Sequence, residues 1–192
     1  IHLCAGEPDF STAAPIREAG MRAISEGCTG YSEVGGIPKL RQALSEFYAE
    51  DYGIHVPPEK ILITPGASGG ILLICALLLN PREAMLVTDP GYPCNRHFMR
   101  LVEANAQLVP VTAQDNFQLT PELINQNWKE NTVGAMVASP SNPTGTTLSR
   151  DDLKKISILL KKLGGHLIVD EIYHGLGFKK DIPSILEILF NL

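Results

Sequence analysis

Short apolar runs alternate with helix-like segments through most of the chain, and this alternation limits the possible folds more than any other feature. Runs such as AMLVTD and VGAMVA have the length of strands, and the segments between them carry apolar residues at helical spacing. The runs are apolar on both faces, which is typical of a parallel sheet that helices cover on both sides. We therefore predict an α/β fold of three layers (αβα), with a mostly parallel sheet between two layers of helices.

The expected elements follow one another in a regular order. Strands are expected in the segments ILI (61–63), AMLVTDPGY, AQLVPVT, VGAMVASP and HLIVDEI. Helices are expected at residues 12–26, 35–53, 71–80, 94–104, 119–128 and 149–163. Gly66 to Gly70 are expected to form a tight turn before the third helix. Ser149 is the expected N-cap of the last helix, because its hydroxyl can accept from a first-turn N–H group.

Polar residues follow the expected strands at their carboxyl ends, which is where ligands bind in sheets of this type. Four segments share this position: TPGAS (64–68), DPGY (89–92), SPSNP (139–143) and DEIY (170–173). Because the carboxyl ends of parallel strands meet at one edge of a sheet, we expect the four segments to border a single crevice.

The first three segments suit a phosphate and a planar ring. The segment GASGG precedes a helix, so its N–H groups and the positive helix end favour an anion, to which Ser68 adds a hydroxyl. It matches neither a dinucleotide fingerprint nor a Walker loop, and a turn needed only for geometry is the alternative. Tyr92 either stacks on a planar ligand or packs against a loop. Asn142 either hydrogen-bonds a ring oxygen or makes an Asn-Pro turn.

Asp170 is the most informative of these residues. It ends an apolar strand, where a buried carboxylate is costly unless a cation or hydrogen-bond donors meet it. It either binds a loop or faces a cation, and a protonated pyridine nitrogen would serve because a nearby carboxylate favours the charged ring. Tyr173 is placed to reach the phenolic oxygen of the same ring. We interpret a phosphate cradle, an aromatic ring, an amide and an acid at one crevice as a cofactor site.

The composition bounds the partners and the compartment. With 192 residues, 44% of them hydrophobic and 19% charged, the chain is typical of globular proteins with one sizeable core. The net charge of −5 argues against nucleic acid or an anionic membrane as a partner. No apolar run approaches the roughly 18 residues of a membrane span. Four scattered cysteines form no pattern typical of metal sites, so we expect no metal and a reducing, cytoplasmic location.

Six segments, in the same order, resemble those of the fold-type I, pyridoxal-5′-phosphate (PLP)-dependent class I/II aminotransferases, of aspartate-aminotransferase type. They are LCAGEPDF, GYSEVGGIPKLRQAL, TPGASGG, DPGYP, SPSNPTG and VDEIYHGLGF. The resemblance runs nearly from end to end. It implies the PLP-binding large domain over residues 31–192, incomplete at its C-terminal end, and part of a small domain over residues 1–30. It also implies transfer of an amino group between an amino acid and a 2-oxo acid.

The resemblance gives each polar position a role. Asp170 is expected to pair with the pyridinium nitrogen and keep the ring electron-withdrawing, which makes it the catalytic residue of this chain. Asn142 and Tyr173 are expected to hydrogen-bond the 3′ oxygen. The other cofactor contacts are expected from Gly66, Ala67 and Ser68 at the phosphate and from Tyr92 stacked on the ring.

Two further roles follow from the same resemblance. Gly6 is expected to contact the substrate carboxylate through its backbone. Tyr31 is expected to reach the phosphate of a neighbouring subunit, which implies a homodimer because this contact is made only in trans.

The sequence departs from the family in lacking the lysine that forms the internal Schiff base. The lysines after Asp170 are Lys179 and Lys180, in GFKKDIP, which resembles the loop after the aspartate strand. The arginine that binds the substrate carboxylate is also absent, and both ends read as cut within a domain. We therefore expect an N-terminal portion of an aminotransferase that is inactive alone. Alternatives are a carbon–sulfur lyase or aminocyclopropane-carboxylate-synthase-like enzyme, and a non-catalytic homologue or cofactor-sensing domain of a regulator.

Overall fold

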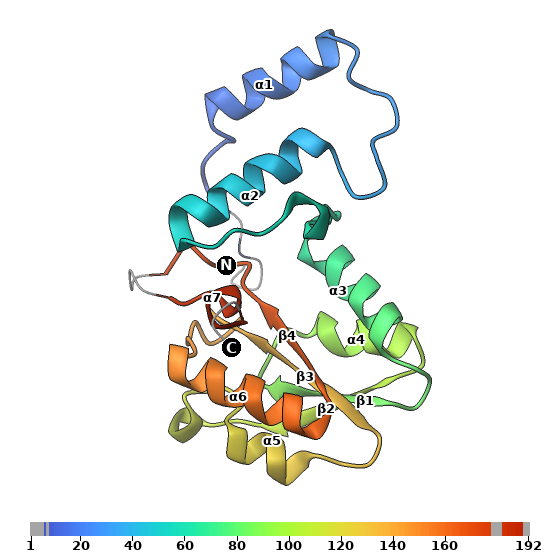
Figure 1. Cartoon of the computed structure of the whole chain (residues 1–192), viewed down its shortest axis with the longest axis vertical. Helices are drawn as coiled ribbons and strands as arrows, with labels where there is room; N and C mark the ends of the chain where they lie inside the picture. Colours follow the sequence, from blue (N-terminus) through green and yellow to red (C-terminus); the bar gives the residue numbers. More distant parts are fainter. Residues whose placement is uncertain (1–5, 7, 178–181, 190–192) are drawn as a thin grey trace.

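Figure 1 shows the computed structural model of the chain, which describes residue 6, residues 8–177 and residues 182–189. At its centre lies a four-stranded parallel sheet with the strand order β2-β1-β3-β4. The strands are β1 (Ala84–Asp89), β2 (Asn105–Pro110), β3 (Thr132–Ala138) and β4 (His166–Asp170). The predicted parallel sheet is therefore confirmed.

Helices cover both faces of the sheet, as Figure 1 shows. One layer contains α3 (Gly66–Leu78) and α4 (Cys94–Leu101), and the other contains α5 (Pro121–Asn127) and α6 (Arg150–Leu163). The remaining described helices are α1 (Ala14–Ser25), α2 (Pro38–Tyr52), α7 (Ile185–Leu189) and the short 3-10 helices η1 (Pro58–Lys60) and η2 (Ala113–Asp115). This arrangement confirms the three-layer α/β fold.

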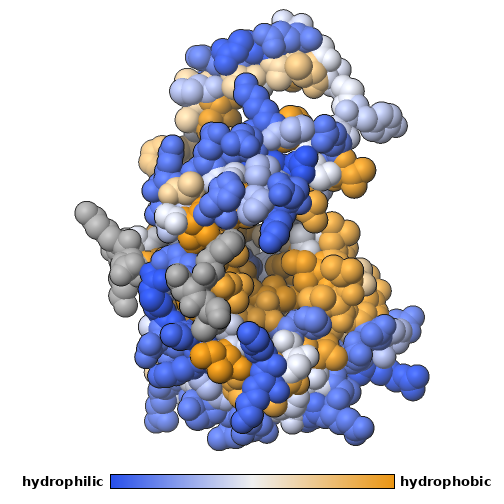
Figure 2. All heavy atoms as spheres, viewed as in Figure 1, coloured by the Kyte–Doolittle hydropathy of each residue, from blue (hydrophilic) through white to orange (hydrophobic). Residues whose placement is uncertain are grey.

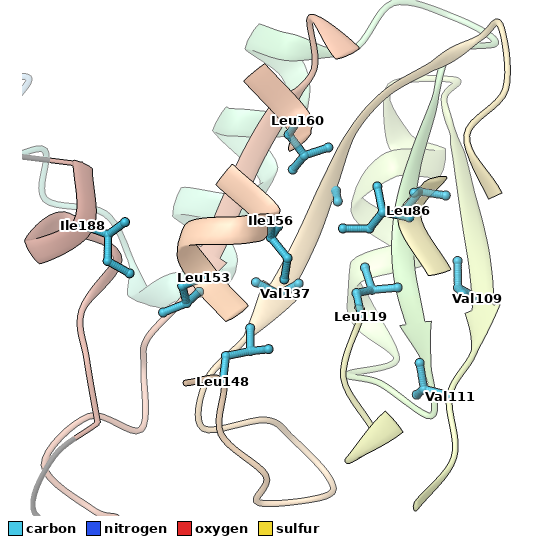
Figure 3. Packing of buried hydrophobic residues seen from close by; sticks show 12 residues of the cluster. Leu86, Val109, Val111, Leu119, Val137, Leu148, Leu153, Ile156, Leu160 and Ile188 are labelled. Carbon is cyan, nitrogen blue, oxygen red and sulfur yellow. The ribbon is translucent and has the colours of Figure 1, made fainter. Parts of the chain in front are cut away.

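Two hydrophobic clusters hold the layers together, because successive side chains of a strand point to opposite faces. Leu86 of β1 joins the cluster under α5 and α6, which Figure 3 shows from close by. Its neighbours Met85 and Val87 join the cluster under α3 and α4. Cys75 is fully buried in that second cluster, where it packs as a small hydrophobe.

The position of a strand in the sheet decides how far it is buried. The central strands β1 and β3 are almost entirely buried, as predicted for strands that are apolar on both faces. The edge strands β2 and β4 are partly exposed. Each edge strand has a hydrogen-bonded neighbour on one side only among the described residues, and its outer side is less covered.

Several helix ends follow the local chemistry of the sequence. The Ser149 hydroxyl accepts a hydrogen bond from Asp152 N–H at 3.1 Å, which confirms the predicted N-cap of α6. Helix α2 ends at Gly53, whose φ of 67° is left-handed and thus favours glycine. Thr120 caps α5 through an acceptor oxygen in the same way as Ser149.

Two local predictions are wrong. Ile61 is extended, but residues 61–63 belong to no described strand; Ile63 N–H donates to Gly35 O at 3.1 Å and no ladder forms. A strand requires a partner strand, and the described residues place none beside this segment. Gly66 to Gly70 are not a separate turn, because α3 begins at Gly66 and these residues form its first turns.

The N-terminal helices lie at the end of the molecule farthest from β1 and β2 (Figure 1). Helix α1 has no buried residue, whereas Ser45 of α2 is buried. The division between residues 1–30 and 31–192 stays a prediction. None of the helices in the described ranges is both long and apolar enough to cross a membrane.

Candidate functional site

A cavity of about 830 Å³ lies at the carboxyl end of the sheet. Its lining residues follow all four strands: Tyr92 after β1, Asn116 after β2, residues 140–143 and 145–147 after β3, and Tyr173 after β4. Cavities of a few hundred to about 1,000 Å³ are typical of sites for small ligands. Three of the four segments expected to border one crevice, DPGY, SPSNP and DEIY, contribute lining residues, whereas TPGAS does not.

The strand order explains why the cavity forms here. The chain passes from β1 outward to β2, and then returns to place β3 on the other side of β1. Loops after β1 and β3 therefore leave in opposite directions and open a crevice between them. A second, smaller cavity of about 30 Å³ lies at this junction and shares Tyr92, Ser141 and Asn142 with the large one.

Asn142 and Tyr173 meet at the wall of the cavity. The Asn142 Nδ2 group donates a hydrogen bond to the Tyr173 hydroxyl at 3.2 Å, although the two residues follow different strands. Both side chains keep further hydrogen-bonding capacity, since an amide has two N–H donors and a hydroxyl has one donor and two acceptor positions. The pair is therefore equipped to bind an oxygen atom of a ligand in the cavity.

Tyr92 connects the cavity with the start of α3. Its hydroxyl interacts with the side chains of Cys94 and Ser68. The pKa of Tyr92 is raised above its ordinary value, chiefly by the hydrogen bond with Cys94, while the hydrogen bond with Ser68 acts in the opposite direction. Tyr92 thus stays neutral and offers an aromatic ring to the cavity at neutral pH.

The first turn of α3 has the properties of an anion site. It contains Gly66, Ala67 and Ser68, and no side chain caps it. The first N–H groups of a helix have no intrahelical partner, and the helix dipole makes this end positive. A Cβ atom on Gly70 would lie 3.3 Å from Thr64 Oγ1, so glycine permits the close approach of the preceding loop. None of Gly66, Ala67 and Ser68 lines the large cavity, but the Ser68 side chain acts on the hydroxyl of Tyr92, which does line it.

Asp170 ends β4 beside these loops. Its backbone carbonyl accepts from Ser139 N–H at 3.0 Å, and one carboxylate oxygen accepts from Ile172 N–H at 3.0 Å. The side chain is partly buried and does not line the large cavity. Of the two alternatives for Asp170, binding to the loop therefore describes one carboxylate oxygen, Oδ1, which the loop N–H group of Ile172 holds. Among the described residues, none donates a hydrogen bond to the other oxygen, Oδ2.

The two more distant predicted residues differ in position. Gly6 lines the cavity with Tyr92 and Asn142. Tyr31 is fully exposed, so within this chain it is not part of the site. Lys179 and Lys180 lie outside the described residues, and no lysine lines the described part of the cavity.

Sequence reasoning missed Glu171, whose carboxylate ties the cavity wall together. It accepts hydrogen bonds from Ser184 Oγ at 2.9 Å and Ile185 N–H at 2.6 Å. His174 Nδ1 lies 3.9 Å from the same carboxylate and 3.0 Å from the Tyr52 hydroxyl. The loop after β4 is thereby joined to α2 and α7. Glu171 directly follows Asp170 in the sequence, and a second acid at the end of an apolar strand was the available signal.

Sequence reasoning also missed the polar residues that follow β2 and β3 at greater distance, namely Asn116, Thr146 and Thr147. Asn116 Nδ2 donates to Thr147 O at 3.2 Å and so joins two loops at the rim of the cavity. No motif marks these residues. No group of three or more His, Cys, Asp or Glu residues in the described ranges is arranged to hold a metal ion.

Comparison with known protein families shows to which family the chain belongs. The family model described as "Aminotransferase class I and II" matches residues 1–191. The chain belongs to this aminotransferase family. The family resemblance expected from the six sequence segments is confirmed.

Curated relatives of this aminotransferase chain are about twice its length. It is 34% identical over 179 residues to a valine–pyruvate aminotransferase of Mycobacterium tuberculosis, covering 93% of this chain and 46% of the relative. It is 34% identical over 173 residues to an aspartate aminotransferase of Pyrococcus horikoshii, covering 90% of this chain and 44% of the relative. The chain therefore spans about half the length of the curated relatives it matches.

Solved structures of aminotransferases share the fold. An aminotransferase from Mycobacterium tuberculosis superposes with a TM-score of 0.87 at 34% identity, covering 94% of this chain and 49% of that one. An aspartate aminotransferase from Thermus thermophilus, solved with maleate, gives a TM-score of 0.90 at 29% identity, covering 96% and 48%. The fold described above is thus that of the corresponding half of these enzymes.

Proposed function

We propose that this chain forms the cofactor-binding part of a PLP-dependent aminotransferase, which moves an amino group between an amino acid and a 2-oxo acid. Family membership supports the reaction class, and the named relatives are aminotransferases. The single observation that carries the proposal is the cavity in which Tyr92, Asn142 and Tyr173 meet, because each of these residues stands in a segment that resembles the family's cofactor loops.

The groups around the cavity suit the parts of PLP. An uncapped helix start at Gly66–Ser68 fits the phosphate, and the aromatic ring of Tyr92 fits the face of a pyridine ring. The paired Asn142 and Tyr173 fit the 3′ oxygen, since both can donate hydrogen bonds. Asp170 has an oxygen available for the pyridinium nitrogen.

This chain would hold the cofactor and polarise its ring. When bound, PLP supplies an aldehyde for condensation with an amino group and a ring that withdraws electrons. Asp170 would keep the proton on the ring nitrogen, because a carboxylate nearby favours the charged form. Asn142 and Tyr173 would fix the opposite side of the ring. The lysine that forms the Schiff base in the family is not part of this chain.

Partners and location complete the proposal. Tyr31 would contact the cofactor phosphate of a second copy, which makes the working protein a homodimer and agrees with the full exposure of this side chain. Gly6 would contact the substrate carboxylate from the rim of the cavity. A cytoplasmic location agrees with the free state of Cys28, Cys75 and Cys94.

Amino-group transfer is favoured over the other reactions that this scaffold supports. A carbon–sulfur lyase, an aminocyclopropane-carboxylate-synthase-like enzyme or a regulator's sensing domain would use the same cofactor contacts. The relatives reported above are transaminases by name, which favours transfer. Product formation that requires a 2-oxo acid acceptor distinguishes a transaminase from a lyase.

Replacement of Asp170 by alanine tests the proposal. The probe is 4′-deoxypyridoxine 5′-phosphate, a PLP analogue without the aldehyde that would otherwise react with surface lysines. Hydrogen bonds to charged groups contribute about 1.5–3 kcal/mol, so Asp170→Ala should weaken binding to this chain roughly tenfold to a hundredfold. In the full-length protein the same change should abolish most transamination.

The control for this test is Asp51→Ala, at an exposed position of α2 that does not line the cavity, which should bind the analogue normally. Circular dichroism should show that both variants keep the fold. Equal affinity of the unsubstituted chain and the Asp170→Ala variant would refute the assigned role. No binding by the unsubstituted chain would refute the cofactor site itself.

A further inference from the structure

A buried amide lies behind the loop that carries Asn142. Gln118, between η2 and α5, is 2% exposed, and a polar side chain at such depth requires hydrogen-bond partners. Its Nε2 group donates to Ala138 O at 3.0 Å, to Thr146 O at 3.1 Å and to Thr146 Oγ1 at 3.2 Å. An amide has two N–H donors, so one of them is shared between two acceptors.

The acceptors lie at the two ends of one loop. Ala138 is the last residue of β3, and Thr146 follows Asn142 by four positions. Gln118 therefore bridges the two ends of the segment 139–145, which turns back on itself between them. Other hydrogen bonds also close this turn: Ser141 N–H donates to Thr146 O at 2.9 Å, Gly145 N–H donates to Ser141 O at 2.7 Å, and the hydroxyls of Thr144 and Thr146 are hydrogen-bonded at 3.0 Å.

The same carbonyl, Thr146 O, accepts from both Ser141 and Gln118. The turn around Asn142 and the buried amide thus depend on a common atom. We infer that Gln118 is a positioning residue: it closes the loop after β3 and so keeps Asn142 within hydrogen-bonding distance of Tyr173. The step from loop geometry to cofactor binding rests on the proposed function, whereas the step from Gln118 to loop order does not.

The first experiment tests loop order without any ligand. Methionine resembles glutamine in length and lacks its donors, so Gln118→Met leaves both carbonyls without this partner. Amide hydrogen exchange should show at least about tenfold faster exchange at Ser141 and Gly145 in this variant than in the unsubstituted chain, because local opening becomes easier.

Gln107→Met is the matched control. Gln107 lies on β2, is partly buried and donates through Nε2 to Asn127 O, far along the chain from the Asn142 loop. The Gln107→Met variant should leave amide exchange at Ser141 and Gly145 unchanged. If Gln118→Met fails to fold, Thr146→Val removes the hydroxyl that accepts from Gln118 and is hydrogen-bonded to Thr144 Oγ1, keeps the Thr146 carbonyl, and should accelerate the same amides to a smaller extent. Unchanged exchange in the folded variant overturns the inference.

The second experiment asks whether Gln118 acts through Asn142. Binding of 4′-deoxypyridoxine 5′-phosphate is measured for Gln118→Met, Asn142→Ala and the double variant. Loss of one positioned hydrogen bond should weaken binding about threefold to tenfold in Gln118→Met. In the Asn142→Ala background the same substitution should have no further effect, because residues that act in series are not additive.

Full additivity of the two substitutions would overturn the positioning role, since general loss of stability would act equally in both backgrounds. The two experiments also separate the two proposals. Faster exchange together with no binding by the unsubstituted chain would sustain the positioning of the loop and refute the cofactor site. Normal binding by the unsubstituted chain, together with unchanged exchange in Gln118→Met, would sustain the cofactor site and refute the positioning of the loop.

Discussion

Glu171, in the loop after β4, has several polar neighbours. Its carboxylate accepts from Ser184 and Ile185 and faces His174, which in turn contacts the Tyr52 hydroxyl. This negative charge also acts on α2. The pKa of Tyr48 is raised above its ordinary value, first by burial and then by the charge of Glu171. The pKa of Tyr52 is also raised, again first by burial and then by the charge of Glu171.

This raised pKa predicts a loss of stability in alkali. A tyrosine whose folded-state pKa exceeds its unfolded value contributes stability below pH about 10 that is lost as the pH rises through the folded-state pKa. The unfolding free energy from urea titrations should therefore fall as the pH rises above about 10. Tyr48→Phe should make the decline shallower, and Tyr31→Phe, at a fully exposed position, should leave it unchanged. An equal slope in all three proteins would contradict the stated burial of Tyr48.

The helix caps show how far local sequence determines an element. The Ser149 hydroxyl accepts from Asp152 N–H and donates to the Asp152 carboxylate at 2.6 Å. Ser149→Ala should lower the unfolding free energy by about 1 kcal/mol, as expected when an N-cap is lost. Ser157→Ala, inside the same helix, should cause no loss because alanine favours helix. Denaturant titration checks both, and an unchanged midpoint in Ser149→Ala would exclude a capping role.

Elements that follow from the local sequence pattern could be predicted. Features that need a particular contact from elsewhere in the fold could not. The four strands, the cap at Ser149 and the stop at Gly53 follow from local pattern. The segment 61–63 has a strand-like composition, yet no described strand pairs with it. Placing Tyr92, Asn142 and Tyr173 at one cavity followed from the rule for parallel strand ends. Gln118 stands in no motif, and Glu171 lies in the segment DEIY without an expected role, so only their contacts across the fold reveal what they do.

At the scale of the whole molecule, hydrophobic surface gathers where α3 lies (Figure 2). Leu73 and Leu77 of α3 are 61% and 82% exposed, and Leu62 before the helix is 69% exposed. Large apolar patches on a protein surface promote association. The isolated chain should therefore self-associate at high concentration.

Substitution of two leucines tests this expectation. The double variant Leu73→Lys, Leu77→Lys should lower the mass measured by light scattering after size-exclusion chromatography, and its melting temperature should stay close to that of the unsubstituted chain because the replaced side chains are exposed. Leu101→Lys, at a similarly exposed position of α4, should not change the mass. A monomer at every concentration before substitution would refute the expectation.

The two hydrophobic clusters that join the layers contain neither Tyr92, Asn142 nor Tyr173. Side chains that face the cavity and side chains that secure the sheet are thus different sets. Variation at the rim can alter which compound is accepted while the framework persists, so a single ancestral architecture can diversify its chemistry through small changes in loops. Laboratory selection for new specificities has the same freedom, and its libraries belong in the segments after the strands.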